Sequence, residues 1–166
     1  MATRRDRKDE ERFWFRYFRL SDPTKAPEYL EWFGAPDCEY TDEDIDFLTR
    51  RTKRIDVLIL GGSNVTAACI PFIARLSFIT RLDLKDQNLT DDCIPDLLKL
   101  QTLEHLHLGH NNISPEGIKK LVALDNLQTL IFSVHTLITP SIEKEFKDAF
   151  PNCELTICGR YGSDSE

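Results

Sequence analysis

Three histidines and two aspartates are the residues of this chain whose types and spacing best suit chemistry. His105, His107 and His110 follow one another closely, and Asp83 and Asp86 each stand 24 residues before His107 and His110. Imidazole and carboxylate groups both bind zinc, so one hypothesis is a metal site formed by Asp83, His105 and His107. A second hypothesis is pH sensing, because protonated histidines beside the two aspartates would shift the local charge from negative towards neutral.

The sequence favours neither hypothesis strongly. No further carboxylate or thiolate obviously completes a metal shell, and we predict neither a bound metal nor a cofactor. Sequence motifs typical of enzymes are missing. Gly61, Gly62 and Ser63 resemble the start of a phosphate-binding loop but lack its lysine. The spacing indicates no general base near Cys38 or Cys158 that could activate either thiol. We therefore expect no catalytic activity.

The elements that would bring these side chains together repeat along the chain. Five columns of apolar residues keep the same spacing over four copies, with a period of 24 residues. The columns are Ile55, Ile79, Leu103 and Leu127; Leu58, Leu82, Leu106 and Leu130; Leu60, Leu84, Leu108 and Phe132; Val65, Leu89, Ile113 and Leu137; and Ile70, Ile94, Ile118 and Ile142. The first three columns alternate with outward residues as in a strand, and Ile118, Leu121 and Leu124 have the spacing of a helix face.

Each copy is therefore predicted to form a strand, a cap and a returning helix. Thr66, Thr90 and Ser114 can cap the helices, and Pro115 suits the first helical position because no amide donor is needed there. This spacing, L-x-x-L-x-L-x-x-N-x-L, resembles the leucine-rich repeat family. The resemblance implies an α/β fold: a solenoid formed by a right-handed β–α superhelix, with a parallel concave sheet, outer helices and a cap at each end.

The ninth position of the repeat departs from the family pattern. The family normally has an asparagine there, whose side chain binds the turn backbone in a ladder that runs through the stack. This chain has Ser63, Gln87, Asn111 and His135 instead. Because only Asn111 matches, we expect a poorly formed ladder and looser turns.

The segment before the first clear repeat has two interpretations. Residues 30–48 follow the repeat spacing, which would make them a degenerate first repeat. We favour the alternative, a short helix over residues 27–33 followed by an edge strand over residues 37–40, because Gly34 and Pro36 both disfavour a full strand.

The chain is predicted to have three parts. Residues 1–53 form an N-terminal helical cap with a degenerate first repeat, residues 54–157 form the repeats with a closing helix and strand, and residues 158–166 form a disordered tail. Residues 13–18 (FWFRYF) are dense in aromatic side chains and predict a helix that seals the open end of the stack. The alternative is a partner-binding helix, since one apolar stripe does not need five aromatic residues, and we include Trp14 among the candidate contact residues.

Outward strand residues of successive repeats should stand side by side on the concave face, about 4.8 Å apart. The predicted columns are Val57, Arg81, His105 and Thr129; Ile59, Asp83, His107 and Ile131; and Gly62, Asp86, His110 and Val134. From these columns we predict the partner-binding residues Val57, Ile59, Arg81, Asp83, Asp86, His105, His107, His110, Ile131 and Val134. Such a face measures roughly 250–300 Å², whereas a specific protein interface needs about 800 Å² on each partner. We expect a peptide ligand, weak binding, or additional contacts from the N-terminal flank.

Composition limits the kinds of partner and the cellular location that we expect. The net charge is −7, and the basic residues between positions 4 and 12 are matched by acidic neighbours, so we expect no binding to nucleic acid. The five cysteines are an odd number, no apolar stretch is long enough to span a membrane, and residues 1–12 lack the apolar core of a signal peptide. We therefore expect a cytoplasmic protein without membrane insertion that is monomeric when unbound. Cys69 and Cys93 should fill space in the core rather than form a disulfide.

Taken together, the sequence predicts a non-catalytic protein–protein interaction module that binds a protein or peptide through the concave sheet and the N-terminal flank. Three roles stay open. The module could be an adaptor, an inhibitor or immunity protein that occludes an enzyme or toxin, or an assembly factor for a larger complex.

Overall fold

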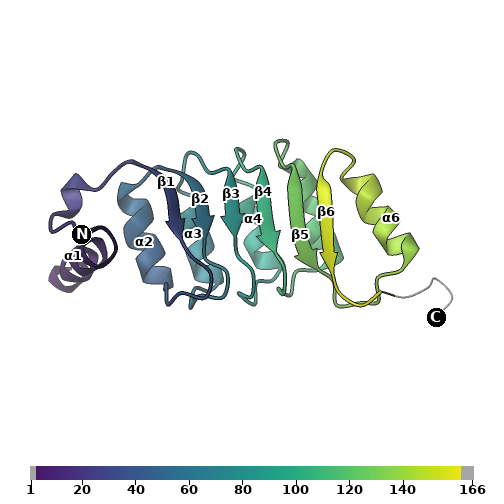
Figure 1. Ribbon diagram of the computed structural model, residues 1–166, viewed down its shortest axis with the longest axis horizontal. Helices are drawn as coiled ribbons and strands as arrows, with labels where there is room; N and C mark the ends of the chain where they lie inside the picture. Colours follow the sequence, from purple (N-terminus) through teal and green to yellow (C-terminus); the bar gives the residue numbers. More distant parts are fainter. Residues whose placement is uncertain (1–2, 162–166) are drawn as a thin grey trace.

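A computed structural model of the chain, which describes residues 3–161, contains one sheet of six parallel strands in chain order (Figure 1). The strands are β1 (Tyr29–Gly34), β2 (Arg54–Ile59), β3 (Arg81–Asp83), β4 (His105–Leu108), β5 (Thr129–Ser133) and β6 (Glu154–Cys158). The α-helices are α1 (Arg4–Phe18), α2 (Asp42–Arg51), α3 (Ile70–Ile73), α4 (Ile94–Leu97), α5 (Pro115–Lys120) and α6 (Pro140–Ala149). Short 3₁₀ turns are η1 (Pro23–Lys25), η2 (Ala67–Cys69), η3 (Asp91–Cys93) and η4 (Leu121–Ala123).

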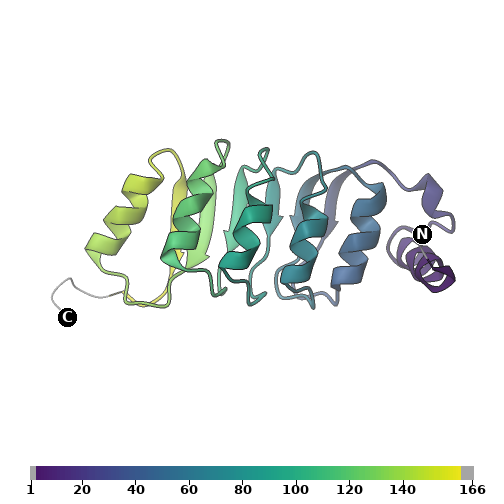
Figure 2. The same ribbon diagram turned by 180° about the vertical axis from the view of Figure 1, so that it is seen from behind.

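The helices that connect the strands all lie on one face of the sheet. Figures 1 and 2 show α2 to α6 in a row behind the strands, and no described helix covers the opposite face. We call this opposite face the open sheet face; it corresponds to the surface predicted from the sequence as concave. The α/β solenoid predicted from the repeats is therefore confirmed.

The repeat period is also the pairing register of the strands. Arg81 pairs with Val57 on β2 and with His105 on β4, and His105 pairs with Thr129 on β5. Residues 24 positions apart are therefore neighbours in space, as the columns predicted.

Apolar columns from all the repeats form one continuous core. Leu58, Leu82 and Leu130 are fully buried, and Leu106 is 2% exposed. Successive repeats cover each other's apolar faces, so no repeat is a stable unit by itself. As predicted, Cys69 and Cys93 lie in this core as free thiols.

One of the predicted apolar columns has the wrong residue in the last repeat. The sequence places Leu137 at the buried position after the strand, but Ile138 is fully buried there and Leu137 is only half-buried. The turn after β5 holds one extra residue. The following strand keeps this shift, because Thr129 pairs with Glu154, a partner 25 positions later.

The favoured interpretation of residues 27–40 is also wrong, and the degenerate first repeat is present. Residues 29–34 form β1 rather than a helix and pair in parallel with β2, where Leu30 meets Ile55. Aromatic side chains such as Trp32 suit a strand better than a helix. Gly34 ends the strand with φ +97°, and a Cβ atom there would lie 1.9 Å from the carbonyl oxygen of Ile59. Gly34 therefore permits close strand packing instead of ending a helix.

The turn ladder is better formed than the sequence suggested. The Asn111 Nδ2 atom donates to the carbonyl of Leu84 in the preceding repeat at 2.8 Å, and its Oδ1 atom accepts from the backbone N–H of Gln87 at 3.0 Å. Gln87 in turn donates to the carbonyl of Leu60 at 2.9 Å. Its longer amide reaches the same kind of acceptor as asparagine, which is why the substitution preserves the ladder.

Most predicted caps are present, with one exception. Thr66 and Ser114 accept hydrogen bonds from backbone N–H groups of the turns that follow them, whereas Thr90 makes no such bond. The Ser114 cap is itself held by the neighbouring repeat, because its backbone N–H donates to the Asp91 carboxylate at 2.7 Å. Helix starts are thus joined across repeats by side chains that the repeat pattern alone does not reveal.

The N-terminal helix α1 seals the open end of the core, as one interpretation predicted. Phe13 and Trp14 are buried, and the Phe13 ring centroid lies 6.2 Å from that of Phe33 on β1. The Arg51 Nε atom lies 2.7 Å from a carboxylate oxygen of Glu10, a buried acid. Burial of Trp14 removes it from the candidate contact residues, because its indole faces the core and not solvent.

The C-terminal boundary lies later than predicted. Cys158 belongs to β6, and the carbonyl of Arg160 accepts a hydrogen bond from the backbone N–H of Ile138 at 2.6 Å. Residues 158–161 are therefore part of the folded body rather than of a tail. The rest of the predicted tail, residues 162–166, lies outside the described residues.

The shared core makes a testable prediction. Replacing Leu106, which is 2% exposed, by aspartate places a charge among apolar neighbours. We expect Leu106→Asp to lower the free energy of unfolding by more than about 4 kcal/mol, enough to unfold the whole domain. Asn112→Asp adds the same charge at an exposed position of the same repeat and should melt like the wild type. A cooperative, wild-type melt for Leu106→Asp would contradict the repeat assignment.

Candidate functional site

The open sheet face carries two adjacent columns of outward side chains. The first column, in strand order, is Trp32, Val57, Arg81, His105, Thr129 and Glu154. The second column is Gly34, Ile59, Asp83, His107, Ile131 and Thr156. The predicted columns are thus correct over β2 to β5, and the structure extends them by one strand at each end.

A hollow of about 210 Å³ lies between the columns at β3 to β5. Its polar lining includes Arg81, Asp83, His105 and His107, and Ile131 contributes an apolar side. The middle of the face is therefore polar and slightly recessed, which suits a small protruding group of a ligand.

Hydrogen bonds between neighbouring strands hold these polar side chains in place. His107 Nδ1 lies 3.3 Å from a carboxylate oxygen of Asp83, and the other Asp83 oxygen accepts from the backbone N–H of Lys85 at 3.0 Å. His105 Nδ1 lies 2.6 Å from the Thr129 hydroxyl oxygen. Both histidines are thus oriented by partners on an adjacent strand.

The pKa of Asp83 reflects the balance between burial and these bonds. Partial burial alone would raise the pKa of this carboxyl. The hydrogen bonds from His107 and from the Lys85 backbone outweigh burial and lower the pKa of Asp83 below its ordinary value of 3.8. Asp83 is therefore a fixed negative charge in the recess.

Two glycines leave the space that these side chains occupy. A Cβ atom on Gly109 would lie 2.8 Å from His107 Nε2, and a Cβ atom on Gly61 would lie 2.8 Å from an Asp83 carboxylate oxygen. Glycine at these two positions therefore lets the His107 and Asp83 side chains lie close to the backbone.

The third predicted column forms a turn beyond the strands rather than a further row of the sheet face. Gly62, Asp86 and His110 have left-handed backbone conformations, with φ between 57° and 70°. Asp86 and His110 are exposed at this edge of the sheet. Val134, by contrast, is 5% exposed, because the longer turn of the last repeat directs it into the core. The prediction that Val134 lies outward on the surface is therefore wrong.

Sequence reasoning missed the aromatic residues of β1. Trp32 is 63% exposed and Tyr29 is 48% exposed, and the Trp32 indole, with Val57 and Glu31, lines a second hollow of about 510 Å³. The available signal was the repeat spacing of Leu30 and Phe33, which puts Trp32 at an outward position. Because we favoured a helix for residues 27–33, we did not predict that Trp32 is exposed.

The metal hypothesis is not supported. Within residues 3–161, no group of three or more His, Cys, Asp or Glu side chains is placed to hold a metal ion. His105 binds Thr129 rather than joining His107 and Asp83.

Within residues 3–161, no helix combines the length and apolar character needed to cross a bilayer.

The strand–turn–helix units, their common register and their shared core define a solenoid repeat protein. A family model described as "Leucine Rich repeat" matches residues 99–122, which contain β4 and α5. Since the other units repeat the same apolar columns and the same strand pairing, this match and the architecture together fit a leucine-rich repeat protein. A comparison with curated proteins found no match.

The contact between His107 and Asp83 can be tested by titration. We expect His107→Ala to raise the pKa of Asp83, because a hydrogen bond to the carboxylate is lost while its partial burial is kept. NMR of the carboxyl carbon measures this pKa directly. His110→Asn changes an exposed histidine that does not contact Asp83, and it should leave the titration unchanged.

The same contact sets a pH dependence of stability. A lowered pKa means that ionised Asp83 stabilises the fold at pH values above the unfolded pKa, and that this contribution is lost as pH falls through the folded pKa. The part of the stability difference between the wild type and His107→Ala that depends on Asp83 ionisation should therefore be complete above about pH 3.8 and be lost as pH falls from there through the lower folded pKa. An unchanged Asp83 titration in His107→Ala would show that the Lys85 backbone bond alone lowers the pKa.

Proposed function

We propose that this protein is a non-catalytic interaction module that binds a peptide, or an extended segment of a protein, on the open sheet face. The observation that carries the proposal is the strand register, which aligns Trp32, Val57, Arg81 and His105 across four neighbouring strands beside a recess. Leucine-rich repeats generally serve as interaction scaffolds, which supports this class of function. Solenoids present such surfaces already ordered, so little conformational entropy is lost on binding.

The dimensions of the face favour a narrow ligand. Six strands spaced about 4.8 Å apart, each about four residues long at about 3.3 Å per residue, give an area of roughly 300 Å². A folded partner would have to bury about 800 Å². An extended segment that crosses the strands fits the available width, and a larger partner would also have to contact the exposed aromatic residues of β1.

Charge and apolar surface suggest the chemistry of the ligand. Arg81 is exposed and forms no ion pair with any residue between 3 and 161, so it is free to bind a carboxylate. Trp32 and Val57 beside it offer an apolar contact. We infer a ligand segment with an acidic residue next to an aromatic or aliphatic one. Tryptophan and arginine are also the residues that most often dominate binding energy at interfaces.

Two of the five thiols, those of Cys93 and Cys153, give no support to a catalytic alternative. Burial raises the pKa of the Cys93 thiol to about 12 and that of Cys153 to about 11. Thiols with such pKa values remain protonated at neutral pH and are poor nucleophiles.

Affinity capture tests the proposal. Native lysate is passed over the wild type, over a sheet-face variant (Trp32→Ala with Arg81→Gln) and over a matched control (Val122→Ala with Lys99→Gln). The control removes one exposed apolar side chain and one positive charge on the helical side, so both variants lose the same charge and one exposed apolar side chain each. We expect a partner that binds the wild type and the control and is reduced at least ~tenfold on the sheet-face variant.

Two other results would contradict this function. Equal recovery of the partner on both variants would remove the open sheet face as the binding surface. Loss on the control alone would move the site to the helical side. Circular dichroism and thermal melts must first show that all three proteins are folded, which we expect because the four replaced side chains are exposed.

A further inference from the structure

Two of the four acidic residues of α1, Asp6 and Glu10, pair with α2 rather than with basic residues of their own helix, contrary to the expectation from the sequence. The Asp6 carboxylate lies 3.1 Å from Arg50 of α2, and Glu10 lies 2.7 Å from Arg51 of the same helix. Both acids therefore face the repeat stack and are neutralised there. The basic residues of α1 are left on the side that faces away from the stack.

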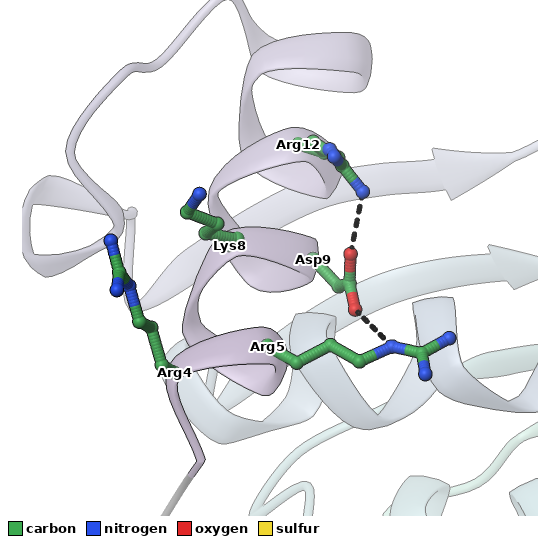
Figure 3. Close-up of a pocket in the computed structure, with 5 residues that line it drawn as sticks. All are labelled: Arg4, Arg5, Lys8, Asp9 and Arg12. Carbon is green, nitrogen blue, oxygen red and sulfur yellow. Dashed lines mark hydrogen bonds and ion pairs between the residues drawn. The ribbon is translucent and has the colours of Figure 1, made fainter.

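The outward face of α1 is predominantly cationic. At 100° per residue, the side opposite Phe13 and Tyr17 is occupied by seven residues: Arg4, Arg5, Lys8, Glu11, Arg12, Phe15 and Arg16. We call these seven residues the outer face of α1. Figure 3 shows four of its cations: Arg5 and Arg12 pair with Asp9, whereas Arg4 and Lys8 point away from it. Arg4, Lys8 and Arg16 form no ion pair with any described residue.

One apolar side chain is exposed within this cationic face. Phe15 is 55% exposed and lines a hollow of about 350 Å³ with Lys8, Glu11, Arg12 and Ser21. Four cations and Asp9 line a neighbouring hollow of about 490 Å³. Phe13 and Trp14 are buried in the core, whereas Phe15 lies outside it, with the Arg19 guanidinium carbon 5.9 Å from its ring centroid.

Charge is strongly segregated along the molecule. Residues 4–19 contain seven Lys or Arg and four Asp or Glu, a net charge of +3. The whole chain contains 21 Lys or Arg and 28 Asp or Glu. The residues outside 4–19 therefore contain 14 Lys or Arg and 24 Asp or Glu, a net charge of −10. Figures 1 and 2 place α1 at the N-terminal end of the stack, beyond α2. The basic helix is therefore at one tip of an acidic body.

We propose that the outer face of α1 docks the protein onto an anionic lipid surface. A bilayer matches each observation: its charged headgroups attract the cations, and its interface accepts the exposed phenyl ring of Phe15. A helix at the tip of the stack can lie flat on a plane while the acidic body points away from it. A long nucleic acid would instead be repelled by that body. The open sheet face is not covered in this arrangement, so the proposal is independent of the peptide-binding function.

Sedimentation with lipid vesicles tests the proposal on the full chain. The probes are vesicles of phosphatidylcholine alone and vesicles with equal amounts of phosphatidylcholine and phosphatidylserine. We expect binding only to the phosphatidylserine vesicles, and weaker binding as salt is added. The variant Arg4→Gln, Lys8→Gln, Arg12→Gln should bind at least ~tenfold more weakly, because three cations are lost from the surface.

A matched control separates local contacts from net charge. Lys99→Gln, Lys120→Gln, Lys144→Gln removes three exposed cations elsewhere on the body and should bind vesicles within about twofold of the wild type, since charges beyond a Debye length of the surface contribute little. Phe15→Ala should weaken binding several-fold without changing the salt dependence.

The lipid assignment is overturned if the wild type does not bind phosphatidylserine vesicles at low salt. Equal binding by the triple variant and its control would also overturn it. The third contradicting result is tighter binding to a labelled single-stranded oligonucleotide, or to polyglutamate, than to the vesicles. That result would identify the outer face of α1 as a site for nucleic acid or for an acidic protein segment.

Discussion

The structure depends on one constraint, the burial of each repeat's apolar face by its neighbours. No strand–helix unit of about 24 residues can enclose a core of its own, so every unit must stack on the next in the same register. Parallel pairing at a fixed period then decides which side chains enter the core and which point to solvent. Leu106 is buried and His107 is not, because the strand alternates and the helices lie on only one side of the sheet. The open sheet face is thus a direct consequence of how the core is formed.

Such a stack has two ends that cannot be covered by another repeat. At the N-terminal end α1 supplies the missing apolar surface through Phe13 and Trp14, and ion pairs from Asp6 and Glu10 attach it to α2. These ion pairs use two of the four acidic side chains of α1, while exposed basic residues such as Arg4 and Lys8 face outward. The cap thereby acquires a charge opposite to that of the body, and our proposal of a lipid-binding face rests on this segregation.

Much of the fold could be predicted from sequence, because the repeat pattern reports directly on burial and pairing. The columns through Arg81, His105 and Thr129 were predicted correctly from spacing alone. Errors arose where a local signal conflicted with a tertiary one. Gly34 resembled a helix terminator but serves close strand packing, and the extra residue after β5 moved Val134 and Ile138 into the core.

Other features could not be predicted, because they depend on contacts between side chains distant in sequence. The ladder bond from Gln87 to Leu60, the carboxylate of Asp91 on Ser114, and the inward direction of Asp6 and Glu10 have no periodic signature. The exposure of Trp32 could be inferred only after residues 29–34 were known to form a strand. Spacing therefore predicts the scaffold well and the polar contacts and end caps poorly.

Photo-cross-linking tests the central claim, that the register of the repeats forms the recognition surface. p-Benzoylphenylalanine is placed at Val57, between Trp32 and Arg81 on the open sheet face, or at Val122 on the helical side, and each protein is irradiated in native lysate. We predict a discrete cross-linked partner from position 57 and none from position 122. A cross-link from position 122 alone would contradict the account.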